Sequence, residues 1–401
     1  MALNMTVHHK TRQTFFDGFM RQRSVLINFL EFLPDDRARS EYAQLLLNRL
    51  LFLHFMQQKD LLDQNESYLQ DKLQQCVDGG QLFYTDFCQP HLFPALSDGN
   101  FHEQICGAIP FLGVDLFLLQ PPNVSWPDVP IPNDFFKQFF AFLADYQWSP
   151  DEKPVSGNEF VVSPKVLGYI FEKNVNTLSS GKIGHKASGA YYTPAIVATF
   201  MAEQAILPTI QCRVEEHLRT HFETYADLFD ESRNPNVRMT CLYLFTEVLP
   251  GFSVLDNACG AGAFLVSALQ VLVRVWTQVT FPILGEPAVR DAILADSAAH
   301  NSGSSGYFRQ FDDVGTFMTD AHWRYYFTRQ VMTHNLYGVD LEVGAVNTAK
   351  MRLWLSLIAE IGEKDVNIAR VVPLPTLDAH LRSGNSLVGY ITDRKQSGVS
   401  S

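Results

Sequence analysis

The sequence predicts an α/β protein, with a helical N-terminal domain over residues 1–150 and a mostly parallel sheet, flanked by helices on both sides, over residues 151–401. Three observations lead to this prediction. Apolar residues recur at helical spacing through the first part of the chain. In the second part, two short apolar strands each end in an aspartate, and a glycine turn joins the first of them to an apolar helix.

Composition limits the classes of protein to consider. With 46% hydrophobic and 18% charged residues, the 401-residue chain can form two or three domains with substantial cores. It has no run of about 18 apolar residues and no apolar signal core at its start, so we expect a cytoplasmic protein that does not enter a membrane. The six cysteines form no C-x-x-C pair, and we expect no metal site. The net charge of −12 counts against a stand-alone nucleic-acid-binding module, although a local basic groove or a further part could still bind DNA.

The N-terminal domain should consist mainly of helices. Apolar residues at helical spacing over residues 15–32 predict a first helix, which Pro34 ends. Asp35 and Asp36 open a second helix, where acidic side chains suit the helix dipole. Further helices are predicted at residues 66–76 and 135–144, the latter capped by Asn133 or Asp134. The many phenylalanines are typical of a core rather than of a base-stacking surface.

The boundary between the two domains falls within a polar segment, residues 146–158, which follows a Pro-rich connection over residues 120–132. A short helix over residues 166–174 leads into a basic segment, residues 179–189. That segment is compatible with a solvated linker or with a loop that touches a phosphate or another ligand.

A distinctive run, Gly-Ala-Tyr-Tyr-Thr-Pro, follows at residues 189–194 and precedes a helix over residues 195–206. Thr193 is placed as the N-cap of this helix and Pro194 as its first residue. A capped helix explains Thr193 and Pro194, but it gives no reason for Gly189 or for the two tyrosines.

The chain is organised around a strand, a glycine turn and a helix within residues 253–268. Residues 252–255 read as a buried strand that Asp256 closes, Gly260 and Gly262 form a tight turn, and residues 264–273 form an apolar helix. At the carboxyl edge of a parallel sheet, such a turn lets a ligand approach the backbone near free N–H groups of the helix. A dinucleotide fingerprint does not fit, because the acid precedes the glycines. A glycine turn that binds another nucleotide, or one that is merely structural, remains the alternative.

The second strand, residues 336–340, follows a predicted insertion over residues 277–335. Asp340 at its end could accept both ribose hydroxyls of an adenosine, or it could cap the helix over residues 343–361. Within the insertion, the aromatic cluster of residues 323–327 is predicted to be core. Further on, Asn385 offers both a hydrogen-bond donor and an acceptor to a ligand, with a simple Ser-Gly-Asn turn as the alternative.

Taken in order, these segments resemble a known family. The run Asp-x-Ala-Cys-Gly-x-Gly-x-Phe at residues 256–264 resembles motif I of the amino-methylating DNA methyltransferases. Gly-x-Tyr-Tyr-Thr-Pro resembles motif X of the γ-ordered adenine methylases, Gly-Val-Asp-Leu at residues 338–341 resembles motif II, and Gly-Asn-Ser-Leu at residues 384–387 resembles the motif III region. From about residue 155 to 390 the chain is similar to type IIG-like restriction–modification and phage-defence methylases.

The resemblance implies a partial Rossmann-like, S-adenosylmethionine-dependent methyltransferase sheet with about three of the usual strands. It also implies S-adenosylmethionine as cofactor and a set of residues that contact it. This set comprises Gly189, Tyr191, Thr193, Asp256, Ala258, Cys259, Gly260, Gly262, Phe264, Asp340, Leu341, Asn385 and Ser386. Lys350 and Arg352, beside motif II, are interpreted as solvated or structural.

The catalytic tetrad of the family, Asn-Pro-Pro-Tyr, does not occur in the sequence. In the family it accepts from the amine of a flipped adenine and stacks on the base. We therefore expect no catalytic residue among these 401 residues and interpret them as the N-terminal part of a longer DNA adenine methyltransferase. Double-stranded DNA would bind mainly through the missing C-terminal part, which could also be a separate, complementing chain. Two alternatives remain: a non-catalytic partner subunit of a split methylase, and a small-molecule methyltransferase.

Overall fold

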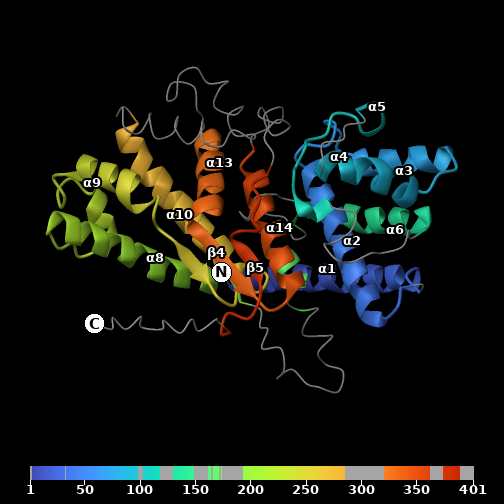
Figure 1. Ribbon diagram of the computed structural model, residues 1–401, viewed down its shortest axis with the longest axis horizontal. Helices are drawn as coiled ribbons and strands as arrows, with labels where there is room; N and C mark the ends of the chain where they lie inside the picture. The colour runs from blue at the N-terminus through green and yellow to red at the C-terminus, as the bar shows by residue number, and fades with distance from the viewer. Residues whose placement is uncertain are drawn as a thin grey trace, which may run out of the picture.

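A computed structural model describes residues 2–31, 33–97, 103–117, 130–148, 161–163, 166–170, 173, 193–284, 320–361 and 374–388. These residues are mostly helical and include a small parallel sheet. Figure 1 shows the N-terminal helices on one side, the helices and strands of the second half on the other, and α14 between them.

The N-terminal part is a group of helices. Its elements are α1 (Ala2–Asn28), α2 (Asp36–Gln57), α3 (Tyr68–Asp78), a π-helix (Phe83–Leu92), α4 (Phe93–Ser97), α5 (Glu103–Cys106), a 3-10 turn (Asp115–Phe117) and α6 (Asn133–Ala144). Two short strands, β1 (Gln147–Trp148) and β2 (Val161–Val162), pair in parallel after α6.

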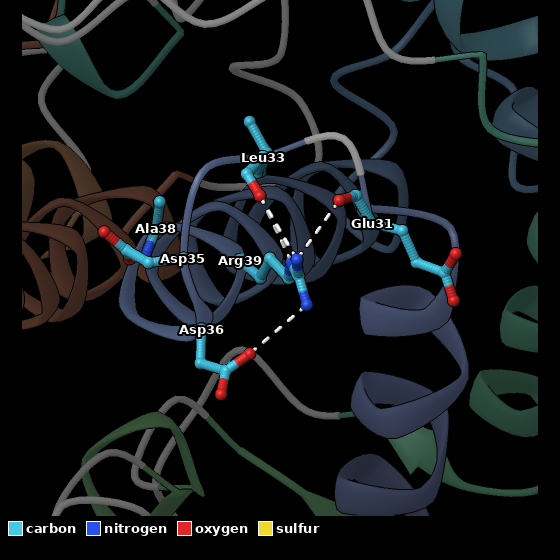
Figure 2. A network of polar contacts seen from close by, with 6 residues as sticks. All are labelled: Glu31, Leu33, Asp35, Asp36, Ala38 and Arg39. Atoms are coloured by element: carbon cyan, nitrogen blue, oxygen red, sulfur yellow. Dashed lines mark hydrogen bonds and ion pairs between the residues drawn. The ribbon is translucent and has the colours of Figure 1, made fainter.

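The corner between α1 and α2 is held by the start of α2 (Figure 2). The predicted acidic start is confirmed, because Asp35 Oδ1 accepts a hydrogen bond of 2.8 Å from the Ala38 N–H. Arg39 donates from Nη2 to the Glu31 carbonyl at 3.1 Å and from Nε to the Leu33 carbonyl at 3.3 Å. One arginine thus binds two carbonyls of the connection between α1, which ends at Asn28, and α2.

Packed aromatic rings form the interior of this part, as the phenylalanine pattern predicts. Phe136 is 0% exposed, and its ring centroid lies 5.1 Å from that of Phe83 and 5.2 Å from that of Phe135. The predicted cap of α6 is wrong. Asn133 instead joins α6 to the π-helix, accepting from the Phe83 N–H and donating to the Gln81 carbonyl, both at 2.8 Å.

The second part contains the larger sheet. Its elements are α8 (Ala195–Leu218), a 3-10 turn (Tyr225–Phe229), α9 (Val237–Tyr243), a π-helix (Leu244–Val248), β3 (Val254–Asp256), α10 (Ala263–Thr280), a 3-10 turn (Phe281–Ile283), α13 (Asp320–Gln330), a π-turn (Val331–Asn335), β4 (Leu336–Asp340), α14 (Val343–Ala359) and β5 (Leu381–Ser383). The predicted second strand is found at its predicted bounds. The cluster at residues 323–327 is core as predicted, with Trp323 2% and Phe327 1% exposed. By contrast, α10 continues past Thr277 to Thr280, into the start of the predicted insertion.

The three strands are parallel and lie in the order β3-β4-β5. Helices α10 and α14 pack against the strands and against each other. A Cβ built on Gly338 of β4 would lie 2.9 Å from Leu265 of α10, which shows how closely that helix approaches this face. On the opposite face Leu255 is 65% exposed. Helices on both faces were expected, but the described residues place them on one face only.

Two helices, α8 and Ala263–Ile283, are long and apolar enough to cross a membrane by length and composition. The second is mostly buried, as expected for a core helix. Helix α8 packs its buried stripe against α10 and carries Glu203, which pairs with Arg274 of α10 at 2.7 Å.

Helix α14 connects the two halves of the molecule. Lys59, just after α2, donates to the carbonyls of Ala359 and Ile361 at 2.9 and 3.1 Å, at the C-terminal end of α14. A cation at this end also complements the helix dipole. The N-terminal helices therefore contact α14, the helix that begins beside Asp340.

Candidate functional site

The glycine turn between β3 and α10 contains two glycines that serve different purposes. Gly260 and Gly262 have φ angles of +50° and +79°, which favour glycine. A Cβ on Gly260 would meet nothing within 4 Å, whereas a Cβ on Gly262 would lie 2.9 Å from the Ala349 Cβ of α14. Gly262 thus permits close packing of the turn on α14, and Gly260 leaves backbone open to an approaching group.

The two strand-ending acids lie at the same edge of the sheet. Because β3 and β4 are parallel, with Asp256 in register with Gly338, their carboxyl ends meet there. Asp340 is also bonded to the glycine turn: its Oδ2 accepts from the Gly260 N–H at 2.8 Å. Its Oδ1 accepts from the Glu342 N–H at 3.0 Å. Each carboxylate oxygen has a second lone pair, so Asp340 can still accept from a ligand hydroxyl.

Asp340 does not cap α14 directly, because Glu342 is the N-cap residue. The Asp340 backbone carbonyl accepts from the Gly384 N–H at 2.8 Å, which joins the segment after β5 to the same edge of the sheet. The turn, the end of β4 and the start of the 384–387 segment therefore converge.

Asp256 carries an unsatisfied oxygen. Its Oδ1 accepts from the Ala258 N–H at 3.2 Å, but its buried Oδ2 accepts no hydrogen bond within the described part of the chain. Burial raises the pKa of this carboxyl; the Ala258 N–H opposes that shift, and the nearby Asp340 carboxylate adds to it. A buried acceptor without a partner is costly and would gain from a cationic or hydrogen-bonding ligand.

Cys259 lies beneath the turn. It is 4% exposed, and its N–H donates to the Val339 carbonyl at 2.9 Å. Burial, together with the Asp256 and Asp340 carboxylates, raises the pKa of its thiol to about 12. The side chain is therefore a neutral packing group at this position, whereas Ala258 is exposed and Phe264 is half-buried.

The remaining predicted residues on this side are exposed. Leu341 is 69% exposed beside Asp340, and Asn385 and Ser386 are both exposed. Asn385 Oδ1 accepts from the Leu387 N–H at 2.9 Å, so Asn385 opens a turn, but this turn follows Asn385 and does not span the Ser-Gly-Asn run named as the alternative. The Asn385 amide nitrogen can still donate.

The Tyr-Tyr-Thr-Pro run is only partly described. Gly189 and Tyr191 lie outside the described residues, while Thr193 is half-buried. The predicted Thr193 cap is wrong: Pro194 is the N-cap residue, and its carbonyl accepts from the Val197 and Ala198 N–H groups. The helix starts at Ala195, the first residue of the predicted range, but Pro194 is its N-cap and not its first helical residue, and the helix continues past residue 206 to Leu218.

The start of α8 nevertheless lies at the same end as the glycine turn. The Thr199 and Ser267 hydroxyls are 3.4 Å apart, and Glu203 pairs with Arg274 further along. Since both contacts advance from N- to C-terminus, α8 and α10 run parallel. Thr193 and the turn therefore precede helices that begin side by side.

Sequence reasoning did not assign two residues of α14 to the site, Ala349 and Arg352. Ala349 underlies Gly262, and Arg352 donates from Nη1 to the Ala261 carbonyl at 2.6 Å. Their spacing of three along one helix places both on the same face, which was the available signal. The described residues contain no group of three potential metal ligands.

Comparison with known proteins gives two matches. No family model matches the chain. The chain is 26% identical over 399 residues to a Methanocaldococcus jannaschii protein named "Putative type II restriction enzyme and methyltransferase RM.MjaORFECS2P", a match that covers 94% of the chain and 30% of that protein. The structure of the present chain is similar to that of the type IIL restriction-modification enzyme MmeI in complex with DNA. The TM-score is 0.52 and the sequence identity 15%, and the match covers 93% of this chain and 40% of the MmeI chain. The chain thus spans well under half the length of both proteins, and the second likeness concerns the fold alone.

Proposed function

We propose that these residues form the S-adenosylmethionine-binding part of a DNA adenine methyltransferase in restriction–modification or phage defence. The complete enzyme would transfer methyl to the exocyclic amine of an adenine flipped out of duplex DNA. The observation that carries the proposal is the bond between Asp340 and the Gly260 N–H at the shared edge of β3 and β4. Similarity over 94% of the chain to a protein named as a restriction enzyme and methyltransferase supports the class of activity.

The residues at this edge suit the chemistry of the cofactor. S-adenosylmethionine, when bound, supplies an electrophilic methyl group on a sulfonium. Asp340 would accept from the ribose hydroxyls with its free lone pairs, and Gly260 would allow the cofactor to approach the backbone. The unpartnered Asp256 Oδ2 would accept a hydrogen bond from the cofactor's cationic methionine end. Leu341 and Asn385 would flank the adenine, and Thr193 would lie over the methionine end.

Orientation of the target adenine would come from groups beyond these 401 residues, because the sequence lacks Asn-Pro-Pro-Tyr. Such groups would belong to a continuation of the chain or to a complementing chain, which would also make most of the DNA contacts. Leu255 on one face of β3 is 65% exposed, and parallel sheets are normally covered on both faces, so a further element would find room on this face.

Calorimetry with S-adenosylmethionine tests the cofactor site. The chain should bind the cofactor, and Asp340→Ala should weaken binding about 10- to 100-fold, the worth of one or two charge-assisted hydrogen bonds. Asp36→Ala, which removes a fully exposed carboxylate in α2, is the control and should bind normally. A folded wild-type chain that binds no cofactor would refute the site.

A methylation assay tests whether the catalytic groups lie outside these 401 residues. The chain should transfer no methyl group from radiolabelled cofactor to DNA. Transfer by these residues alone would contradict the proposal that catalytic groups lie elsewhere.

A further inference from the structure

We propose that Arg352 is a positioning residue that holds the glycine turn in its binding shape, and that Gly168 exists to admit its guanidinium. The inference rests on the proposed function for its effect on cofactor binding. Its effect on the turn itself can be measured without any cofactor.

Arg352 holds the middle of the turn. Its Nη1 donates to the carbonyl of Ala261, the residue between the two glycines of positive φ, at 2.6 Å. Both residues are buried, with Arg352 7% and Ala261 0% exposed. A charged donor in such surroundings makes a strong hydrogen bond, and its loss would leave a buried carbonyl unsatisfied.

All three residues of the turn are fixed by the β4–α14 unit. The Gly260 N–H donates to Asp340, the Ala261 carbonyl accepts from Arg352, and Gly262 rests on Ala349. The contact to Asp340 faces the proposed ligand, whereas the other two support the turn from beneath. Arg352 therefore acts through the turn and does not itself contact the proposed ligand.

Gly168 leaves room for the guanidinium. A Cβ at this position would lie 2.5 Å from Arg352 Nη1 and 2.9 Å from its Cζ. Residues 166–170 are helical, and Gly168 does not have a positive φ, so the backbone does not require glycine. Alanine favours a helix more than glycine does. The space taken by Arg352 is thus the physical reason for a glycine here.

The same contact joins the N-terminal helices to the turn. The neighbour of Gly168, Tyr169, donates its hydroxyl to Gln13 Oε1 of α1 at 2.9 Å, and its ring lies edge-on to Phe16. A path of direct contacts therefore runs from α1 through residues 168 and 169 to Arg352 and Ala261. On this inference α1, acting through Tyr169 and Gly168, helps to shape the proposed cofactor site.

Four variants test the inference through two measurements, hydrogen exchange of residues 253–268 in the free protein and cofactor affinity. Gly168→Ala and Arg352→Met should each speed exchange in this segment and weaken cofactor binding about tenfold, as expected for one lost hydrogen bond to a charged group. Arg352→Lys keeps a hydrogen-bond donor, so its exchange should speed up less, and its cofactor affinity should fall less, than in Arg352→Met. The double variant Gly168→Ala/Arg352→Met should show the same exchange and the same cofactor affinity as Arg352→Met alone, because no guanidinium remains to collide with the new methyl group.

Two controls separate positioning from general destabilisation. In Gly251→Ala the new Cβ meets only the Glu247 carbonyl oxygen at 3.9 Å, so exchange and affinity should stay unchanged. Phe136→Leu, in the N-terminal core, should lower the melting temperature without changing exchange in the turn.

The outcomes distinguish the two proposals. Faster exchange in Gly168→Ala with a wild-type chain that binds no cofactor would remove the proposed function and leave the positioning of the turn intact. Unchanged exchange in both Gly168→Ala and Arg352→Met would overturn the role of Arg352 whether or not the cofactor binds. Faster exchange with unchanged affinity would overturn its role in binding.

Discussion

The N-terminal helices and the β3–α14 region are stabilised in different ways. In the former, many aromatic rings contact several neighbours each, as Phe136 contacts Phe83 and Phe135. In the latter, a few directed contacts meet at one short turn, and glycines allow them. Loss of a contact should therefore cost mainly stability in the first region, and mainly ligand binding in the second.

The largest effect on stability is expected in the aromatic core. Phe136→Ala removes a ring that is 0% exposed and should lower the free energy of unfolding by about 3–5 kcal/mol, measured by denaturant titration. Well below the unfolding transition, cofactor affinity should match that of the wild type. Weakened binding by the folded variant would show that the two regions do not divide their roles in this way.

An intermediate effect is expected in the turn, where the two glycines can be compared directly. Gly262→Ala combines an unfavourable positive φ with a collision against Ala349, so it should destabilise the chain by about 2–4 kcal/mol. Gly260→Ala meets open space and should cost only about 1–2 kcal/mol from its φ angle, while cofactor binding falls sharply. Thermal unfolding and calorimetry measure both quantities. Equal losses of stability would contradict the different roles of these glycines.

The smallest effect concerns Asp256. Because burial raises its pKa in the folded chain, the native state holds the proton more tightly than the unfolded state does. The free energy of unfolding should therefore fall as the pH rises from about 3.8, the ordinary pKa of an aspartate, through the raised pKa of Asp256 in the folded chain. Asp256→Asn should flatten this pH dependence and raise the melting temperature at neutral pH by up to about 2 °C. It should also weaken cofactor binding, and a less stable variant at neutral pH would contradict the assignment.

Much of the fold could be predicted because local patterns determine it. The apolar strand ending in Asp340, the acidic start of α2 and the buried cluster around Trp323 were all readable from neighbouring residues. The caps of α6 and α8 were not, because Asn133 binds across to another element and Pro194 takes the cap position that Thr193 was expected to hold.

The candidate site was predictable in part. Parallel strands bring their carboxyl ends together, so the common edge of Asp256 and Asp340 followed from the strand pattern. Arg352 could not be assigned, since an arginine within a helix ordinarily reaches solvent and its burial here depends on Gly168, far away in the sequence. The roles of Gly189 and Tyr191 remain predictions.

The bond from Lys59 to the end of α14 bears on how the chain folds as it is made. The partners of Lys59, Ala359 and Ile361, lie about 300 residues downstream. The Leu112 carbonyl likewise accepts from the N–H of a much later residue, Leu374. At a synthesis rate of about 5–20 residues per second, the first helices emerge from the ribosome about 15–60 s before these partners do. During that interval any packing of their aromatic interior takes place without α14, and the surface that α14 later covers is available to chaperones.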